Sequence, residues 1–263
     1  MRFLRPAAIV AKNDTMRIRM VAVPLIGTVE EVMVDCPTGS SWTVRVEPFA
    51  LAETVVTRGL WDDVHGVAGD PEMSNFPKTD LSWRDAIRFC NALSEREGLE
   101  PVYQISQRDV PQPAPTRWRP HSEPELDDWI VAWDHGADGY RLPTDAEWQV
   151  ACRAGTSGAR YGRLDDIAWY VENSGGTVHP VRSKEPNAWG LFDLLGGVWE
   201  WCWDLYDPES YGSYRIIRGG GWSDPQWSCR SGVRRKTNPT ASFDDLGFRV
   251  AQGAVSAPAV RPG

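Results

Sequence analysis

The feature that most constrains this chain is segment 187–204, which reads NAWGLFDLLGGVWEWCWD. Four tryptophans and one phenylalanine fall within it. Each buried ring removes a large apolar surface from water, so a solvated loop does not explain such a segment. The adjacent Gly196 and Gly197 permit a tight turn or a close approach of the backbone. We therefore expect the rest of the chain to pack around this segment.

The end of this segment, residues 198–201, is expected to be extended. Alternation would then place Val198 and Glu200 on one side, and Trp199 and Trp201 on the other. A carboxylate between two tryptophans needs a partner, because burying an unpaired charge is costly. Glu200 is therefore either hydrogen-bonded within the protein or a ligand of a cation, and the residues leave both alternatives open.

The composition indicates one loop-rich globular domain, which we place at residues 1–252, with a disordered tail at 253–263. The chain has 263 residues, 41% of them hydrophobic and 24% charged, and an unusual 14 tryptophans. The formal net charge of −8 disfavours nucleic acid and acidic membranes as partners. No apolar run is long enough to cross a bilayer. We predict no nucleic-acid partner and no membrane partner.

The cysteines favour a reducing compartment. There are five, an odd number, dispersed along the chain without a CxxC pair. The N-terminal segment 1–14 has a basic start and a short apolar run interrupted by a proline, without a clear cleavage site. We read it as part of the mature protein and predict a cytoplasmic location.

Two segments, 82–98 and 144–155, have the pattern of capped helices. Each opens with Ser or Thr three residues before Asp or Glu, continues with apolar residues on one face and ends at glycine. Short strands are expected within 17–60, with a short helix beginning within 53–60. Further strands are expected within 215–224 and 246–250, and a surface excursion at 101–139.

The order of several motifs resembles the formylglycine-generating enzyme family, the sulfatase-modifying-factor domain. The motifs are RLPTDAEWQVACRAGT, NSGG, HPVRSKEPNAWGLFDLLGGVWEWCWDLY, IIRGGGWSD, CRSGVRR and LGFRV. VVTRGLW and LSWRDAIRFCNALS resemble its N-terminal half, so the resemblance covers about residues 42–252. It implies an α+β, C-type-lectin-like fold with two main helices, short twisted sheets and much irregular chain.

The resemblance also locates a candidate active site. Members of the family oxidise a cysteine of a sulfatase to formylglycine with oxygen and a copper ion held by two cysteines. One of these positions falls at Cys229, but the other is Asp224, and the serine of active members is Gly221. Because a carboxylate is a hard ligand that does not replace a thiolate for Cu(I), copper is disfavoured.

The family's disulfide positions depart as well. Cys90 and Cys152 match bridging positions in secreted relatives, but their partner positions are Val250 and Arg234. The resemblance therefore implies that neither bridge forms.

A calcium site is the one metal site that the resemblance allows. It would use Glu200 with the backbone carbonyls of Leu195, Gly196 and Val198. Gly197 stands where the family usually has asparagine. A second calcium site of some relatives falls near residues 169–170, does not match, and is not predicted.

Less specific explanations compete for each candidate residue. Cys229 is more often a small buried hydrophobe than a reactive thiol, and Asp224 more often caps a turn. His179 is expected to be structural. A basic cluster, Arg230 with 234–236, is expected to pair with acids such as Asp244 and Asp245.

Two functions follow. The first is an accessory domain that binds a protein or peptide through residues 222–245 and the 101–139 excursion, as ligand-display relatives of this fold do. The alternative is a metal-dependent oxidoreductase that acts on a cysteine or another small thiol-containing substrate through Cys229.

Overall fold

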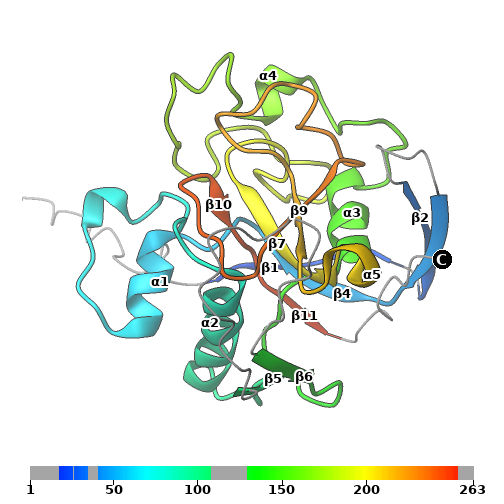
Figure 1. The fold of residues 1–263 in the computed structure, drawn as a ribbon. Helices are drawn as coiled ribbons and strands as arrows, with labels where there is room; N and C mark the ends of the chain where they lie inside the picture. Colours follow the sequence, from blue (N-terminus) through cyan, green and yellow to red (C-terminus); the bar gives the residue numbers. More distant parts are fainter. Residues whose placement is uncertain (1–17, 26, 35–40, 108–128, 254–263) are drawn as a thin grey trace, which may run out of the picture.

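The computed structural model describes residues 18–25, 27–34, 41–107 and 129–253 (Figure 1). Its helices are α1 (Arg58–His65), α2 (Trp83–Arg96), α3 (Asp145–Arg153), α4 (Leu164–Ile167) and α5 (Pro208–Tyr211), with the 3-10 turn η1 (Pro71–Met73). Its strands are β1 (Met20–Ala22), β2 (Val29–Val34), β3 (Ser41–Val46), β4 (Phe49–Ala52), β5 (Tyr103–Gln107), β6 (Trp129–Trp133), β7 (Trp199–Leu205), β8 (Arg215–Arg218), β9 (Arg234–Thr237), β10 (Leu246–Gly247) and β11 (Ala251–Gly253). The two longest helices, α2 and α3, occur among many short strands. The prediction of an α+β fold with two main helices is therefore confirmed.

A four-stranded sheet of order β10-β7-β8-β9 lies between two hydrophobic cores. Trp201 of β7 pairs with Ile217 of β8, and both lie in the core that includes α2. Their neighbours Cys202 and Ile216 lie in the core that includes α3. This is the alternation expected of extended chain, and it explains why the tryptophan-rich segment is covered on both faces.

Helix α2 begins as the sequence predicts. The Ser82 hydroxyl accepts a hydrogen bond from the backbone N–H of Asp85, and the Asp85 carboxylate accepts one from the backbone N–H of Ser82, at 3.2 and 3.0 Å. This reciprocal pair satisfies donors that the first helical turn leaves without partners. Trp83 Nε1 also donates to the carbonyl of Cys202 at 3.0 Å, which fixes the helix against β7.

Helix α3 opens with a second capping box, between Thr144 and Glu147. The Glu147 carboxylate also binds the buried guanidinium of Arg141 through two hydrogen bonds, of 2.7 and 2.9 Å. The Glu147 carboxylate is therefore held by two partners, the backbone N–H of Thr144 and the guanidinium of Arg141. The predicted helix is therefore confirmed, with a charge pair that its sequence pattern did not indicate.

The first residue of α3, Asp145, joins the helix to two strands. Its carboxylate accepts from Arg218 of β8 at 2.5 Å and from Arg234 of β9 at 2.6 Å, and all three side chains are buried. Burial alone would raise the pKa of Asp145. The two guanidinium groups together lower it by a larger amount, so the net shift is downward. These two ion pairs hold the first turn of α3 against strands β8 and β9.

The remaining segments depart from the sequence predictions in two places. The ends of the 101–139 excursion pair as the antiparallel strands β5 and β6, while residues 108–128 lie outside the described residues. Of the closing strand predicted at 246–250, only Leu246–Gly247 forms a strand, β10, and β11 begins after it at Ala251. The carbonyls of Phe248 and Val250 instead accept from the N–H groups of Val56 and Ala52, each at 2.8 Å.

Two further predictions concern membrane spans and the C-terminal tail. In the described part of the chain no helix is long and apolar enough to cross a bilayer. The predicted tail, apart from Gly253, lies outside the described residues, as does Cys36.

Candidate functional site

The candidate site lies where β8 runs into a glycine bend. Gly219 and Gly220 have φ angles of 101° and 86°, a conformation that residues with a Cβ rarely adopt. A Cβ on Gly220 would lie 3.1 Å from the sulfur of Cys229. The bend therefore brings Cys229 against bare backbone, next to the loop that carries Asp224.

Cys229 is a buried thiol. Its side chain is inaccessible to solvent, and burial, followed by the nearby charge of Asp224, raises its pKa to about 12. Arg160 holds the surrounding loop, since its Nε donates to the Cys229 carbonyl at 3.0 Å and its Nη2 to the Gln226 carbonyl at 2.6 Å. A thiol in this environment stays protonated at neutral pH, which makes it a poor nucleophile.

Asp224 is a hydrogen-bond centre. Its Oδ2 accepts from Trp199 Nε1 at 2.6 Å and from the backbone N–H of Gly221 at 3.0 Å. Its Oδ1 accepts from the Ser228 hydroxyl at 3.1 Å and lies 3.2 Å from Arg235 Nη1. Four donors occupy the two oxygens, so the carboxylate holds the loop together, as a turn-capping aspartate does.

These residues do not fit a copper ion. The four described cysteines, Cys90, Cys152, Cys202 and Cys229, are free and buried. Among the described residues there is no cluster of three or more His, Cys, Asp or Glu side chains that could hold a metal ion. A neutral thiol beside a fully bonded carboxylate is not the pair of soft thiolates that Cu(I) requires.

Gly221, which replaces the family's serine, leaves room for another acid. A side chain at this position would overlap the carboxylate of Asp245. Asp245 is partly buried, and its carboxylate accepts a hydrogen bond from the Ser223 hydroxyl at 3.4 Å. Burial, then the charges of Asp224 and Asp244, raise the pKa of Asp245. The site thus exchanges a hydroxyl for a carboxylate.

The basic cluster has partners other than those predicted. Arg235 pairs with Asp224, and Arg234 pairs with Asp145, whereas Asp244 and Asp245 were expected. Arg235 also lies over the rings of Trp199 and Trp227, at 4.8 and 5.1 Å from their centroids. The cluster thus pairs with acids of the same domain, as predicted, but not with the two that were named, because Asp145 is 89 residues away from Arg234 in sequence and meets it only through the packing of α3.

Glu200 forms an ion pair in the protein interior. Its carboxylate accepts from Arg249 Nη2 at 2.6 Å and Nε at 2.7 Å, and from Trp148 Nε1 at 2.8 Å. Both charged side chains are fully buried. Of the two alternatives left open by the sequence, the hydrogen-bonded carboxylate is the one present. Glu200 does not fit a calcium ligand, because a guanidinium already neutralises it.

The backbone part of the predicted calcium site surrounds a tight turn. Gly196, at φ 74°, donates its N–H to the Gly219 carbonyl at 3.0 Å, and Leu195 and Val198 are buried beside it. Asp193 lies nearby, a residue that the sequence analysis missed although it is in the same segment. Burial raises the pKa of Asp193 to about 6, against the opposing effect of a hydrogen bond from the Arg182 N–H. The calcium site predicted from Glu200 and the carbonyls of Leu195, Gly196 and Val198 stays a prediction, and the ion pair between Glu200 and Arg249 argues against it.

Two other features are structural. His179 stacks on Trp169 with centroids 3.7 Å apart and hydrogen-bonds the Ser174 carbonyl at 2.7 Å.

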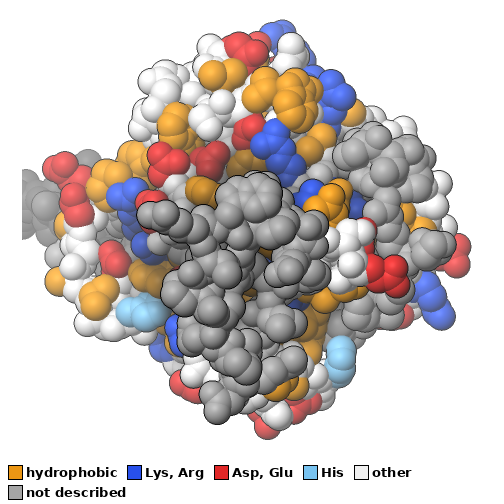
Figure 2. Space-filling view, viewed as in Figure 1, with side chains coloured by type: hydrophobic (Ala, Val, Ile, Leu, Met, Phe, Trp, Pro, Cys, Tyr) orange, Lys and Arg blue, Asp and Glu red, His pale blue; other side chains and the backbone are white. Residues whose placement is uncertain are grey.

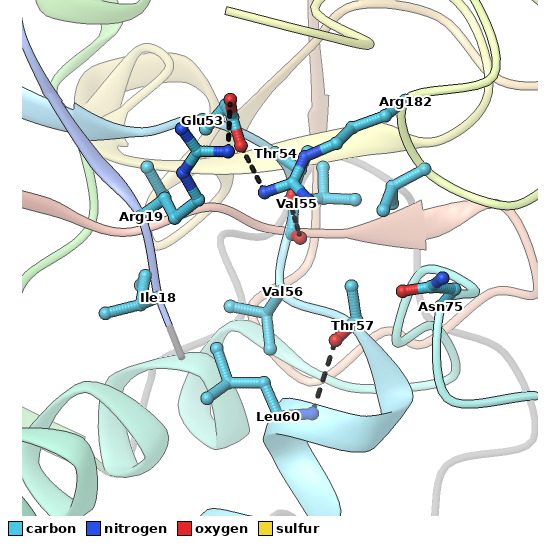
Figure 3. A pocket seen from close by; sticks show the side chains of 12 residues that line it. Ile18, Arg19, Glu53, Thr54, Val55, Val56, Thr57, Leu60, Asn75 and Arg182 are labelled. Atoms are coloured by element: carbon cyan, nitrogen blue, oxygen red, sulfur yellow. Dashed lines mark hydrogen bonds and ion pairs between the residues drawn. The ribbon is translucent and has the colours of Figure 1, made fainter. Parts of the chain in front are cut away.

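A pocket near β4 and α1 has a volume of about 30 Å³, and Figure 3 shows Arg19 and Arg182 directed at Glu53, which lines it. A pocket of this size admits water but not an organic ligand.

The fold and the position of this site define a domain of the formylglycine-generating-enzyme type. The family model described as sulfatase-modifying factor enzyme 1-like domain matches residues 13–254, so the chain belongs to that family.

Three known proteins illustrate what this chain is similar to. The chain is 30% identical to "Chaperone protein LppX" of Paenibacillus barcinonensis, over 81% of this chain and 83% of that protein. It is 33% identical to the formylglycine-generating enzyme of Streptomyces coelicolor, over 81% and 80% of the two chains. The solved structure of Treponema denticola variable protein 1 superposes with a TM-score of 0.74 and 32% identity, over 89% of this chain and 95% of that chain.

Proposed function

We propose that this chain is an accessory member of the family that binds a protein or peptide through residues 222–245 and does not oxidise cysteine. The observation that carries the proposal is the bonding of Asp224. The resemblance aligns Asp224 with a copper-binding cysteine of the family, and four donors hold both oxygens of its carboxylate. A group that is fully bonded within the protein holds a loop in shape, which is what a binding surface needs.

The character of the thiol supports the same proposal. Cys229 is buried, and its pKa is raised to about 12 by that burial and by Asp224. A thiol oxidase needs a thiolate at neutral pH. One relative is named as a chaperone, which agrees with an accessory role.

A direct assay of oxidation tests this function. The purified protein is incubated with Cu(I), and separately with Fe(II), before oxygen uptake is followed with a cysteine-containing peptide. We expect no retained metal and no uptake above that of the Cys229→Ser variant. Oxygen uptake that is lost in this variant would favour the alternative, an oxidoreductase acting on a thiol substrate.

Binding is tested separately, with a displayed library of random peptides selected on the immobilised protein. We expect selected peptides to lose affinity when Trp227 is replaced by alanine, because this exposed side chain lies on the 222–245 segment. If no peptide is selected, or if the Trp227→Ala variant binds as well as the wild type, this surface is not the binding site.

A further inference from the structure

Trp227 is an exposed side chain on a loop that is held at both of its neighbours. Arg160 Nη2 donates a hydrogen bond to the carbonyl of Gln226 at 2.6 Å. On the other side, the Ser228 hydroxyl donates to Asp224 Oδ1 at 3.1 Å. The backbone that carries Trp227 is therefore fixed, although the side chain itself is 47% exposed.

The ring of Trp227 is held as well. The guanidinium of Arg235 lies over this ring, 5.1 Å from its centroid, and also over the buried ring of Trp199, at 4.8 Å. Arg235 is in turn held by Asp224 at 3.2 Å and by the Ser228 hydroxyl at 3.3 Å. A cation over an indole is attracted by the negative face of the ring. Arg235 thus connects an exposed ring to the buried part of β7.

An exposed ring in a fixed position has the properties of a binding anchor. A large apolar side chain stabilises a complex when a partner covers it, and little rotamer entropy is lost if the ring is already held. On the upper part of the molecule, where Figure 1 draws the loop after β8 in orange, Figure 2 shows exposed hydrophobic side chains beside basic ones. Phe243 is also 47% exposed, but within the described part of the chain no ring or cation packs on it. Trp227 is therefore the better anchor.

Arg235 also determines which group can lie on the free face of Trp227. Its guanidinium covers one face, and no other ring or cation among the described residues packs on this indole. A second cation on the opposite face would be repelled by Arg235 and by Arg230, which is exposed on the same loop. A carboxylate would meet the negative face of the indole. The free face therefore favours an uncharged group, and a flat aromatic ring covers it best.

We infer that the partner of this surface is a peptide segment that stacks an uncharged aromatic side chain on the free face of Trp227, and that Arg235 is a positioning residue for this contact. This inference rests on the proposed function and names the chemistry of the partner. Aromatic pairs bind more strongly than their buried area alone accounts for, which distinguishes this contact from a merely apolar one. Arg235 does not touch the peptide and acts by keeping the indole in place.

The peptide side of the contact is tested with one library-selected peptide. Alanine scanning identifies its anchor, the position whose replacement weakens binding most. Forms with phenylalanine, cyclohexylalanine or lysine at this position are compared by fluorescence anisotropy, since cyclohexylalanine keeps the size of phenylalanine without its π system. We expect the cyclohexylalanine form to bind roughly fivefold and the lysine form roughly tenfold more weakly than the phenylalanine form. Equal affinity of either form would overturn the inference.

The positioning role is tested with Arg235→Lys, because lysine keeps the positive charge beside Asp224 but has no planar group to lie over the ring. Fluorine NMR of the fluorotryptophan-labelled protein follows Trp227, whose signal is assigned by its absence in Trp227→Phe. Arg235→Lys should shift this signal in the free protein and weaken the phenylalanine form roughly fivefold. An unchanged signal or an unchanged dissociation constant would overturn the role of Arg235.

A matched control makes the same change elsewhere. Arg88 lies over the ring of Trp129 at 4.4 Å, outside the binding segment. Arg88→Lys should therefore alter neither the Trp227 signal nor the dissociation constant. Both variants are checked for a wild-type melting temperature.

The outcomes separate the two proposals. Peptides that depend on Trp227 but bind as well with lysine at the anchor would overturn this inference and keep the proposed function. Peptides that bind without shifting the Trp227 signal would overturn both. Phe243→Ala should weaken binding less than Trp227→Ala, and an equal or larger loss would make Phe243 the anchor and overturn the inference.

Discussion

Arg249 donates two hydrogen bonds, of 2.6 and 2.7 Å, to the carboxylate of Glu200 in the protein interior, where Trp148 donates a third. Burial lowers the pKa of Arg249, but the charge and the hydrogen bonds of Glu200, together with the charges of Asp193 and Tyr161, raise it by more in sum, and the net shift is upward. The pair joins β7 to the segment between β10 and β11. A position that the family resemblance assigned to calcium therefore carries its own cation.

The first prediction concerns this pair. Arg249→Met should lower the free energy of unfolding by about 3–5 kcal/mol, because Glu200 would be left as an uncompensated buried charge. Urea unfolding followed by tryptophan fluorescence measures the loss. Adding Glu200→Gln to Arg249→Met should recover part of it, since no buried charge then remains. A double variant less stable than Arg249→Met alone would contradict this account.

The same pair predicts the response to calcium. Because the guanidinium neutralises Glu200, we expect 1 mM EGTA or 1 mM calcium chloride to leave the melting temperature unchanged. A calcium-dependent rise that disappears in Asp193→Ala would mean that the turn carbonyls hold calcium with Asp193 in place of Glu200. The melting curves are recorded in the same buffer at pH 7.

The second prediction concerns the pH dependence of Asp204, a buried acid on β7. Its Oδ2 accepts from the Asp145 N–H at 2.6 Å, whereas its Oδ1 has no hydrogen-bond partner. Burial, and then the charge of Asp145, raise its pKa from 3.8 to about 7. Since the folded state holds this proton more tightly, the stabilisation is complete below about pH 4 and is lost as the pH rises toward 7, by at most about 1.4 kcal/mol per pH unit.

Asp204→Asn removes this titration and retains an acceptor for Asp145. The difference in unfolding free energy between wild type and variant, measured from pH 4 to 8, should therefore shift in favour of the variant as the pH rises. A difference that stays constant over this range would show that Asp204 does not carry the proton.

The third prediction concerns Asp224. Asp224→Cys places a second thiol near Cys229, so we expect it to retain Cu(I) that the wild type does not. The variant should also lose a few kcal/mol of stability, because Trp199 Nε1 and the Gly221 N–H lose their charged acceptor. Copper content after gel filtration is the measurement, with Asp224→Asn as the control for lost charge. If Asp224→Cys binds no copper while folded, the assignment of this position to the family's thiolate is wrong.

The fourth prediction concerns the glycine that replaces the family's serine. Gly221→Ser should cost about 1 kcal/mol, because the new side chain meets the Asp245 carboxylate and displaces it from the Ser223 hydroxyl. Asp245→Ala, which frees that space, should make Gly221→Ser nearly neutral. The interaction energy of this double-mutant cycle, from thermal unfolding, should be clearly non-zero, and strict additivity would contradict the contact.

The sequence by itself determined the local features, which depend only on residues close together in the chain. The capping boxes at Ser82 and Thr144 formed where predicted, because each needs only residues three positions apart. The alternation of segment 198–201 held for the same reason. The motifs with glycine and tryptophan were specific enough to indicate the family and its α+β fold.

Tertiary structure alone decided how the buried charges are neutralised. Arg234 meets Asp145 across 89 residues and Arg249 meets Glu200 across 49, and neither spacing has a local signature. A buried charge pairs with whichever opposite charge the packing brings within hydrogen-bond distance. Leaving it unpaired would cost more free energy than a local sequence preference contributes. The sequence could therefore show that Glu200 and Asp224 need partners, but only the packed structure could supply them.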